Sequence, residues 1–200
     1  MPLFLSLYHT AARKLTRAEW LLPTVARFLF AALFLVYFWV SALTKLGDGL
    51  FGIVSPSLGA YAQIFPRAME AVGYDSSQLS LFHTLVVLAG TWAEFLLPFL
   101  IVIGFLTRLS AFGMIGFVIV QTLTDLYGHG VINEASTLGA WFDKMPDAVI
   151  MDQRALWIFL LLVLVIKGAG PLSLDRVLLR NAPWAHPASP PRSQADHPTP

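Results

Sequence analysis

The stretch Gly90–Leu100, GTWAEFLLPFL, places one carboxylate, Glu94, inside an apolar run that extends from about Leu79 to Leu106. A run of this length exceeds the roughly 20 residues that a helix needs to cross about 30 Å of hydrocarbon. Because every backbone polar group in lipid must bond within its own segment, the run is predicted to be a membrane-spanning helix. A charge at that depth is costly, so Glu94 needs either a partner or a proton.

The overall composition also indicates an integral membrane protein. Of the 200 residues, 56% are hydrophobic and 12% are charged, whereas a soluble domain carries about 25% charged residues. The net charge of +1 gives no general attraction to nucleic acid. The chain has no cysteine, which excludes disulfides, thiol redox chemistry, thiolate metal sites and covalent haem attachment.

Four apolar segments predict an all-α fold, an integral membrane four-helix bundle. Three of them cover about residues 22–43, 79–103 and 109–127, and the fourth is the shorter ALWIFLLLVLVI between Arg154 and Lys167. As a helix, those twelve residues rise only about 18 Å. Either the ends of this segment snorkel, or its helix begins upstream near Asp147.

The segments that flank the bundle differ from it in composition. Residues 1–21 form a basic amphipathic segment, residues 22–180 form the membrane domain, and residues 181–200 form a proline-rich tail that we expect to be disordered. The N-terminus lacks the long apolar region and cleavage site of a signal peptide, so we expect the first span to be uncleaved. In the first long loop, residues 57–72, SLGAYAQIFPRAMEAV, predict a short helix on the membrane surface.

The distribution of lysine and arginine predicts that both termini are cytoplasmic. The N-terminal segment carries three such residues, the turn at Arg108 one, and the C-terminal segment four, whereas the two long loops carry two each. Loops rich in these residues stay on the cytoplasmic side. Since the chain shows no organelle-targeting feature, we expect it in a bacterial inner membrane.

Away from the span ends, the two charges within the spans as drawn from the sequence are Arg27 and Glu94. They lie about five and about nine residues from the cytoplasmic ends of their spans, so their depths differ by roughly 6 Å. An arginine reaches that far, and we expect an intramembrane polar pair. Glu94 then has three interpretations: a structural ion pair that fixes helix register, a proton relay or ligand anchor, or a protonated acid with a hydrogen bond.

A second polar group is predicted at the outer ends of the spans. Gln121, Asp125 and His129 are spaced four residues apart, so they share one face of a helix. The full outer polar cluster comprises Lys45, His83, Gln121, Asp125, His129 and Glu134. Such a cluster can bind a metal, hold a polar substrate or quinone headgroup, or cap the helix ends. It contains no tight metal-binding motif, so no metal ligand is assigned.

Several pieces of the sequence resemble the DoxX family of small four-helix membrane proteins over about Ala26 to Leu179. They are RFLFAALFLVYFWVSALTKL, AGTWAEFLLPFLIVIGFLTRLSA, YGHG and KGAGPLSLDRVLLR. The most specific is the Gly-x-Gly-x-x-Ser-Leu-Asp ending, which here consists of Gly168, Gly170, Ser173 and Asp175. The resemblance also marks Arg27, Lys45, Glu94 and Arg108.

The residues of this ending predict a structural role for it. Gly168 and Gly170 let the chain leave the fourth helix, and Pro171 prevents the helix from resuming. Ser173 or Asp175 is then expected to cap a short cytoplasmic helix, DRVLLR. A structural role for this motif is at least as well supported as a catalytic one.

The DoxX resemblance implies a membrane subunit rather than a stand-alone enzyme, although the sequence leaves catalysis open. The family takes its name from a subunit of a thiosulfate:quinone oxidoreductase, and other members are associated with oxidative-stress, sulfur-metabolism or copper-related systems. We therefore expect a quinone-associated or accessory subunit of a membrane redox or stress-response system, with a protein partner or further copies of itself. The alternatives are a small oligomeric transporter or export accessory for a metal or metabolite, and a non-catalytic scaffold. No catalytic residue is assigned.

Overall fold

The computed structural model describes residues 2–180, and over that range it is all-helical. Four of its helices are long and apolar enough to cross a membrane: span 1 (Leu21–Lys45), span 2 (Leu81–Ile103), span 3 (Thr107–Gly128) and span 4 (Val149–Lys167). The all-α, multi-pass architecture is therefore confirmed. Span 4 begins at Val149, upstream of Arg154, as expected for a helix that starts near Asp147. The predicted disordered tail, residues 181–200, lies outside the described residues.

Three of the four spans combine α-helical and π-helical segments. Span 1 consists of α2 (Leu21–Phe30), π-helical η1 (Ala31–Leu35) and α3 (Val36–Lys45). Span 3 consists of α7 (Thr107–Leu123) and π-helical η4 (Thr124–Gly128), and span 4 of π-helical η6 (Val149–Gln153) and α9 (Arg154–Lys167). Span 2 is the single helix α6 (Leu81–Ile103), which continues through Pro98. π-helical turns are rare in proteins, but those that do occur are often found at functional sites.

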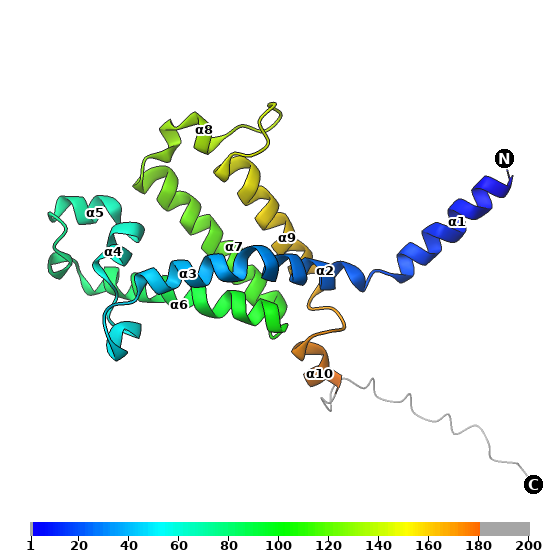
Figure 1. The fold of residues 1–200 in the computed structure, drawn as a ribbon, viewed down its shortest axis with the longest axis horizontal. Coiled ribbons are helices and arrows are strands. Elements are labelled where there is room, and N and C mark those ends of the chain that lie inside the picture. Colours follow the sequence, from blue (N-terminus) through cyan, green and yellow to red (C-terminus); the bar gives the residue numbers. More distant parts are fainter. Residues whose placement is uncertain (1, 181–200) are drawn as a thin grey trace, which may run out of the picture.

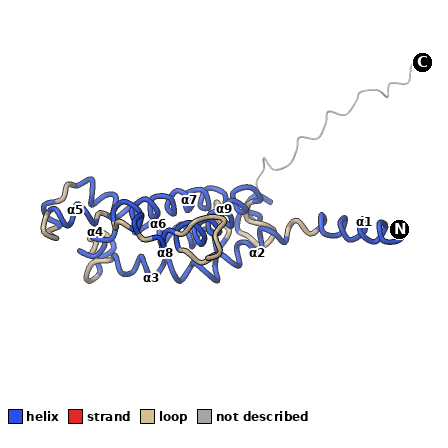
Figure 2. The backbone as a smooth tube through the Cα atoms, turned by 90° about the horizontal axis from the view of Figure 1, so that it is seen from above, coloured by secondary structure: helices blue, strands red, loops and turns tan. Residues whose placement is uncertain are grey.

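Shorter helices lie before, between and after the spans. They are α1 (Pro2–Arg17), η2 (Leu50–Ile53), α4 (Leu58–Ile64), α5 (Pro66–Ala71), η3 (Ser76–Gln78), η5 (Val131–Asn133), α8 (Ala135–Leu138) and α10 (Leu174–Arg180). Helix α1, the basic amphipathic segment, extends away from the bundle beyond the start of span 1 in both Figure 1 and Figure 2.

The short helix predicted over residues 57–72 is in fact two helices, α4 and α5. They break at Phe65 because the residue before Pro66 is disfavoured in a helical conformation. Ala60 and Met69 are fully buried and cluster with Val87 of α6. This pair of helices therefore packs against span 2 in addition to any contact with the membrane surface.

The spans alternate in direction, which gives the bundle two different ends. A tight turn at Gly104 joins spans 2 and 3 at what we call the short-turn end, and the two long loops lie at the opposite, long-loop end. In Figure 1, span 1 runs beside α6, α7 runs beside α9, and the two pairs diverge toward the long-loop end.

The interior of the bundle is apolar, and so is much of its surface. Phe30, Phe38 and Met114 are almost fully buried in the central cluster, where the rings of Phe34 and Trp157 lie 4.9 Å apart. Large apolar side chains also point outward along the spans and are widely exposed. Because the spans are membrane helices, this exposed apolar surface contacts the lipid bilayer.

At the short-turn end, Arg27 ties separate backbone segments together. Its Nε donates a hydrogen bond to the carbonyl of Ile101 at 3.0 Å, and its Nη2 donates to the carbonyl of Val102. Its Nη1 donates to the carbonyls of Ala169, at 2.9 Å, and Leu172. The last carbonyls of a helix lack partners within the helix, and the guanidinium satisfies two of them at the end of α6. We call this arrangement the Arg27 joint.

The glycine-containing ending closes the same joint. Gly168 and Gly170 adopt positive φ angles of 79° and 75°, which lets the chain turn away from α9 as predicted. The Ser173 hydroxyl accepts a hydrogen bond from the backbone N–H of Arg176 at 3.2 Å and so caps α10. Asp175 has a different role, because its carboxylate accepts from two backbone N–H groups at the start of α7, at 2.7 and 2.9 Å.

Gly104 is the residue of this joint that tolerates substitution least. Its φ is +71°, and a Cβ atom there would lie 2.6 Å from the Cβ of Ser173 and 2.9 Å from the Cζ of Arg27. We expect Gly104→Ala to lower the free energy of unfolding by at least about 1–2 kcal/mol, the cost of a left-handed conformation for an L-residue. Thermal unfolding in detergent measures the effect.

Gly116→Ala is the matched control, because a Cβ at that position would have no heavy atom within 4 Å and the backbone is helical. Alanine is favoured over glycine within a helix, so this variant should unfold at the same temperature or higher. Equal unfolding temperatures for the two variants would contradict the role assigned to Gly104.

Candidate functional site

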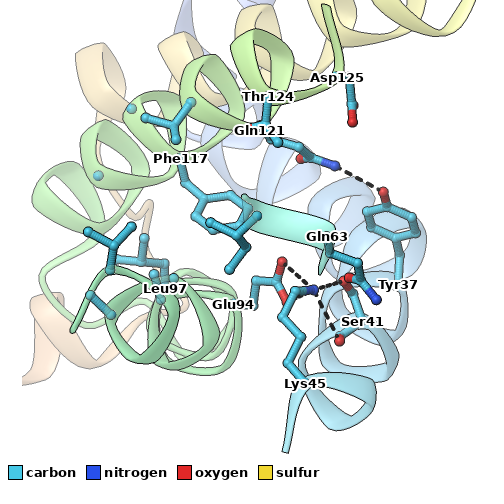
Figure 3. A pocket seen from close by; sticks show the side chains of 18 of the residues that line it. Tyr37, Ser41, Lys45, Gln63, Glu94, Leu97, Phe117, Gln121, Thr124 and Asp125 are labelled. Atoms are coloured by element: carbon cyan, nitrogen blue, oxygen red, sulfur yellow. Dashed lines mark hydrogen bonds and ion pairs between the residues drawn. The ribbon is translucent and has the colours of Figure 1, made fainter. Parts of the chain in front are cut away.

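The carboxylate of Glu94 forms a buried ion pair with Lys45. The Lys45 Nζ lies 2.9 Å from Oε2 and 3.1 Å from Oε1 of Glu94, and the two residues are only 4% and 5% exposed. Lys45 also donates to the hydroxyl of Ser41 at 2.7 Å and to its carbonyl at 3.2 Å (Figure 3). Every charge in this pair therefore has a partner inside the protein.

The expected pairing of Arg27 with Glu94 is wrong. The guanidinium of Arg27 is occupied by the backbone carbonyls of the short-turn end, one of which belongs to Ile101, two turns beyond Glu94 on α6. Lys45, which the sequence placed just outside span 1, is the last residue of α3, and its side chain runs back one turn toward Ser41. A lysine at the end of a helix can reach inward because side chains on a helix point toward its N-terminus.

The ion pair lies on the wall of a pocket with a volume of about 510 Å³, formed by α3, α4, α6 and span 3. Small residues on the two facing helices leave this space open. They are Ala89, Gly90 and Ala93 on α6, and Gly113 and Gly116 on α7. Leu97, Phe117 and Val120 supply further apolar wall, so a few polar groups converge on a mostly apolar space.

Polar side chains from three elements meet at the rim of this pocket. The Gln121 Nε2 on α7 donates to the hydroxyl of Tyr37 on span 1 at 3.3 Å, bridging the two diverging pairs of spans (Figure 3). The Oε1 of Gln121 is buried and has no partner among the described residues. His129 lies 3.0 Å through its Nε2 from the carbonyl of Gln63, which ties the end of span 3 to α4.

A second, partly buried ion pair adjoins the pocket and was not predicted from the sequence. Arg154, 4% exposed, pairs with Asp125 through Nη2 and donates from Nη1 to the Thr122 hydroxyl at 3.0 Å. Because Arg154 bounds the short apolar segment of span 4, it was expected in the second long loop. The longer of the two forms expected for span 4 could have revealed this residue, because a helix that starts near Asp147 contains Arg154.

The structure brings together four residues of the predicted outer polar cluster and separates two. Lys45, Gln121, Asp125 and His129 all line the pocket. The ring of His83 instead packs on Phe65, with centroids 4.7 Å apart, and its Nδ1 lies 2.8 Å from the Ser80 hydroxyl. Glu134 accepts a hydrogen bond from Thr137 at 3.2 Å. Within residues 2–180, no group of three histidine, aspartate or glutamate side chains is arranged to hold a metal ion.

These features define a multi-pass helical membrane protein with a buried ion pair in a pocket between its spans. A model of the DoxX family matches residues 22–125, just over half of the chain, and the chain belongs to that family. The match includes Arg27, Lys45, Glu94 and Arg108 but ends before the Gly168–Asp175 motif. No match was found among curated proteins or among solved structures.

The Lys45–Glu94 pair is expected to show strong non-additivity. Lys45→Met or Glu94→Leu alone leaves one charge buried without its partner, which costs about 3–5 kcal/mol of folding free energy. The double variant removes both charges and should recover most of that loss. Thermal or denaturant unfolding of the four proteins in one detergent provides the cycle.

Lys167→Met is the control, because its ion pair with Glu19 is exposed and should contribute no more than about 1 kcal/mol. Additive effects of the Lys45 and Glu94 substitutions would contradict the pair. So would a Lys45→Met variant as stable as the control.

Proposed function

We propose that this protein is a quinone-associated subunit of a membrane redox or stress-response system. The observation that carries the proposal is the buried Lys45–Glu94 pair on the wall of a largely apolar pocket among the membrane spans. Pockets for organic ligands are mostly apolar, with a few polar groups that fix orientation. A molecule that dissolves in lipid and carries hydrogen-bonding oxygens matches this combination.

The donor set around the pocket fits the carbonyl oxygens of a quinone headgroup. Tyr37 carries an O–H donor, the Lys45 ammonium supplies positive charge, and the buried Oε1 of Gln121, unpartnered among the described residues, accepts from a hydroxyl of the reduced form. The ring of Phe117 offers a flat apolar surface for the headgroup. Trp39 and Trp92 fit less well, because their indole N–H groups donate to the carbonyls of Phe95 and Ile53 instead.

A quinone bound here would supply the exchange of electrons and protons between the membrane pool and a partner protein. The protein's own contribution is to hold the headgroup through the Tyr37 hydroxyl and the charge of Lys45, and to carry a proton on a carboxylate oxygen of Glu94. Lys45 compensates the charge of Glu94 while it is ionised. Asp125 and His129 extend the titratable groups from this pair toward the long-loop end. We therefore propose that Glu94 exchanges its proton with the long-loop side of the membrane through Asp125 and His129.

The proposed setting is the cytoplasmic membrane of a bacterium, with both termini on the cytoplasmic side. The lysine and arginine distribution supports this orientation. A small four-span chain fits best as one member of an assembly, with a protein partner or with further copies of itself.

Transport is the less well supported alternative. On α6 the pocket extends no closer to the short-turn end than Leu97, and the Arg27 joint binds the carbonyls of Ile101 and Val102 beyond it. A pathway through the single chain would have to open that joint. A purely structural scaffold differs from both in requiring no ligand. Quinone retention therefore distinguishes it from a quinone-binding subunit.

Quinone retention by the purified protein tests the proposal. In lipid nanodiscs containing ubiquinone or menaquinone, we expect stoichiometric retention by the wild-type protein. Glu94→Gln and the milder Tyr37→Phe should each weaken retention about ten- to hundredfold, because a lost hydrogen bond to a charged or buried group costs about 1.5–3 kcal/mol. Chromatographic quantification of extracted quinone gives the readout.

Glu19→Gln is the matched control, since Glu19 is an exposed carboxylate in a surface ion pair. It should retain quinone as the wild type does. Equal retention by all four proteins, or no quinone above the level of empty nanodiscs, would refute the quinone proposal and favour the scaffold.

A further inference from the structure

A second pocket lies at the short-turn end, separate from the Lys45–Glu94 site. Its volume is about 780 Å³, and it is formed by the start of α7, the end of α9 and the chain that leads into α10. Three cationic side chains line it, those of Arg108, Lys167 and Arg176, together with the carboxylate of Asp175. The pocket therefore carries a net positive charge.

The cations of this pocket have little internal compensation. Among residues 2–180, the guanidinium groups of Arg108 and Arg176 make no ion pair or hydrogen bond. Lys167 pairs with Glu19 at 3.1 Å, but both side chains are exposed, and such pairs contribute only about 0–1 kcal/mol. Asp175 is already committed to the backbone N–H groups of α7. The three cations are consequently available to an external anion.

Thr107 supplies an independent indication of a ligand. It is fully buried, it lines the pocket, and its hydroxyl has no hydrogen-bond partner among the described residues. Buried hydroxyl groups are normally hydrogen-bonded. Thr107 is also the first residue of the 17-residue helix α7, where backbone N–H groups and the helix dipole favour negative charge. The Thr107 hydroxyl is therefore a donor without an acceptor among the described residues, which an anion in the pocket could supply.

The position of the pocket at the ends of two spans favours a lipid headgroup over a free ion as the anion that it binds. Thr107 begins span 3 and Lys167 ends span 4, so the pocket lies at the depth of lipid headgroups. Three leucines, Leu106, Leu109 and Leu178, also line it and are 50%, 66% and 55% exposed. A free phosphate ion makes no use of this apolar rim, whereas the acyl chains of a lipid do.

We propose that this pocket binds the phosphodiester headgroup of an anionic phospholipid. The phosphate contacts the side chains of Arg108, Arg176 and Lys167 and the Thr107 hydroxyl, and the acyl chains lie along the exposed leucines. A lipid held in this way bridges α7, α9 and α10 next to the Arg27 joint. This inference does not depend on the quinone proposal, since it concerns a different pocket.

Native mass spectrometry of the full chain, exchanged into mixed phosphatidylglycerol and phosphatidylcholine nanodiscs and released, tests this site. We expect the wild type to retain one phosphatidylglycerol more strongly than phosphatidylcholine. Arg108→Gln with Arg176→Gln should lower that retention about thirtyfold, because each basic side chain near an anionic surface contributes about 1 kcal/mol. Lys167→Gln, which keeps both arginines, should lower it several-fold.

Arg67→Gln with Lys144→Gln is the matched control, since both residues are exposed at the long-loop end and the change in net charge is the same. It should retain phosphatidylglycerol like the wild type. Equal losses in the two double variants, or equal retention of the two lipids by the wild type, would overturn the site. Displacement of the lipid by equimolar inorganic phosphate would assign the pocket to a free anion and overturn the lipid proposal.

Discussion

A carboxylate within a membrane-spanning helix requires a cation close by, and in this protein Lys45 provides it for Glu94. The pairing dictates where span 1 must lie, because the last turn of α3 has to face the middle of α6. Ser41 then falls beside the ammonium group, and Tyr37, one turn earlier, reaches the rim of the pocket. Small residues on α6 and α7 keep the space beside the pair open. The buried pair therefore lies on the wall of a pocket and gives it a polar site within the membrane.

The two ends of the bundle have different roles: the short-turn end holds the spans together, and the long-loop end contains the pocket. At the short-turn end, Arg27, Gly104 and the Gly168–Asp175 motif join all four spans through backbone hydrogen bonds and tolerate little change. At the long-loop end the two pairs of spans diverge (Figure 1), and polar side chains line part of the pocket between them. A bundle that is closed at one end and splayed at the other holds a ligand pocket without losing its register.

Much of the fold follows from the sequence, because runs of apolar residues and their length determine membrane spans directly. The site was only partly predictable. Glu94 was identified from its cost in lipid, but its partner was not, since depth along separate helices says nothing about rotation around them. Arg154 was missed because the start of span 4 is π-helical and lies beyond the apolar run that marked it. His83 and Glu134 share an end of the bundle with the pocket but face other neighbours, which sequence spacing cannot reveal.

The most direct test of this account is the identity of the group beside the Glu94 carboxylate in the membrane. Magic-angle-spinning NMR of protein in lipid, with nitrogen-15 in lysine and carbon-13 in glutamate, measures that contact through space. The account predicts one strong correlation between a lysine Nζ and a buried glutamate Cδ, which disappears in both Lys45→Arg and Glu94→Gln. A Glu94 carboxylate coupled to the guanidinium of Arg27 in arginine-labelled protein, or to no cation at all, would contradict it.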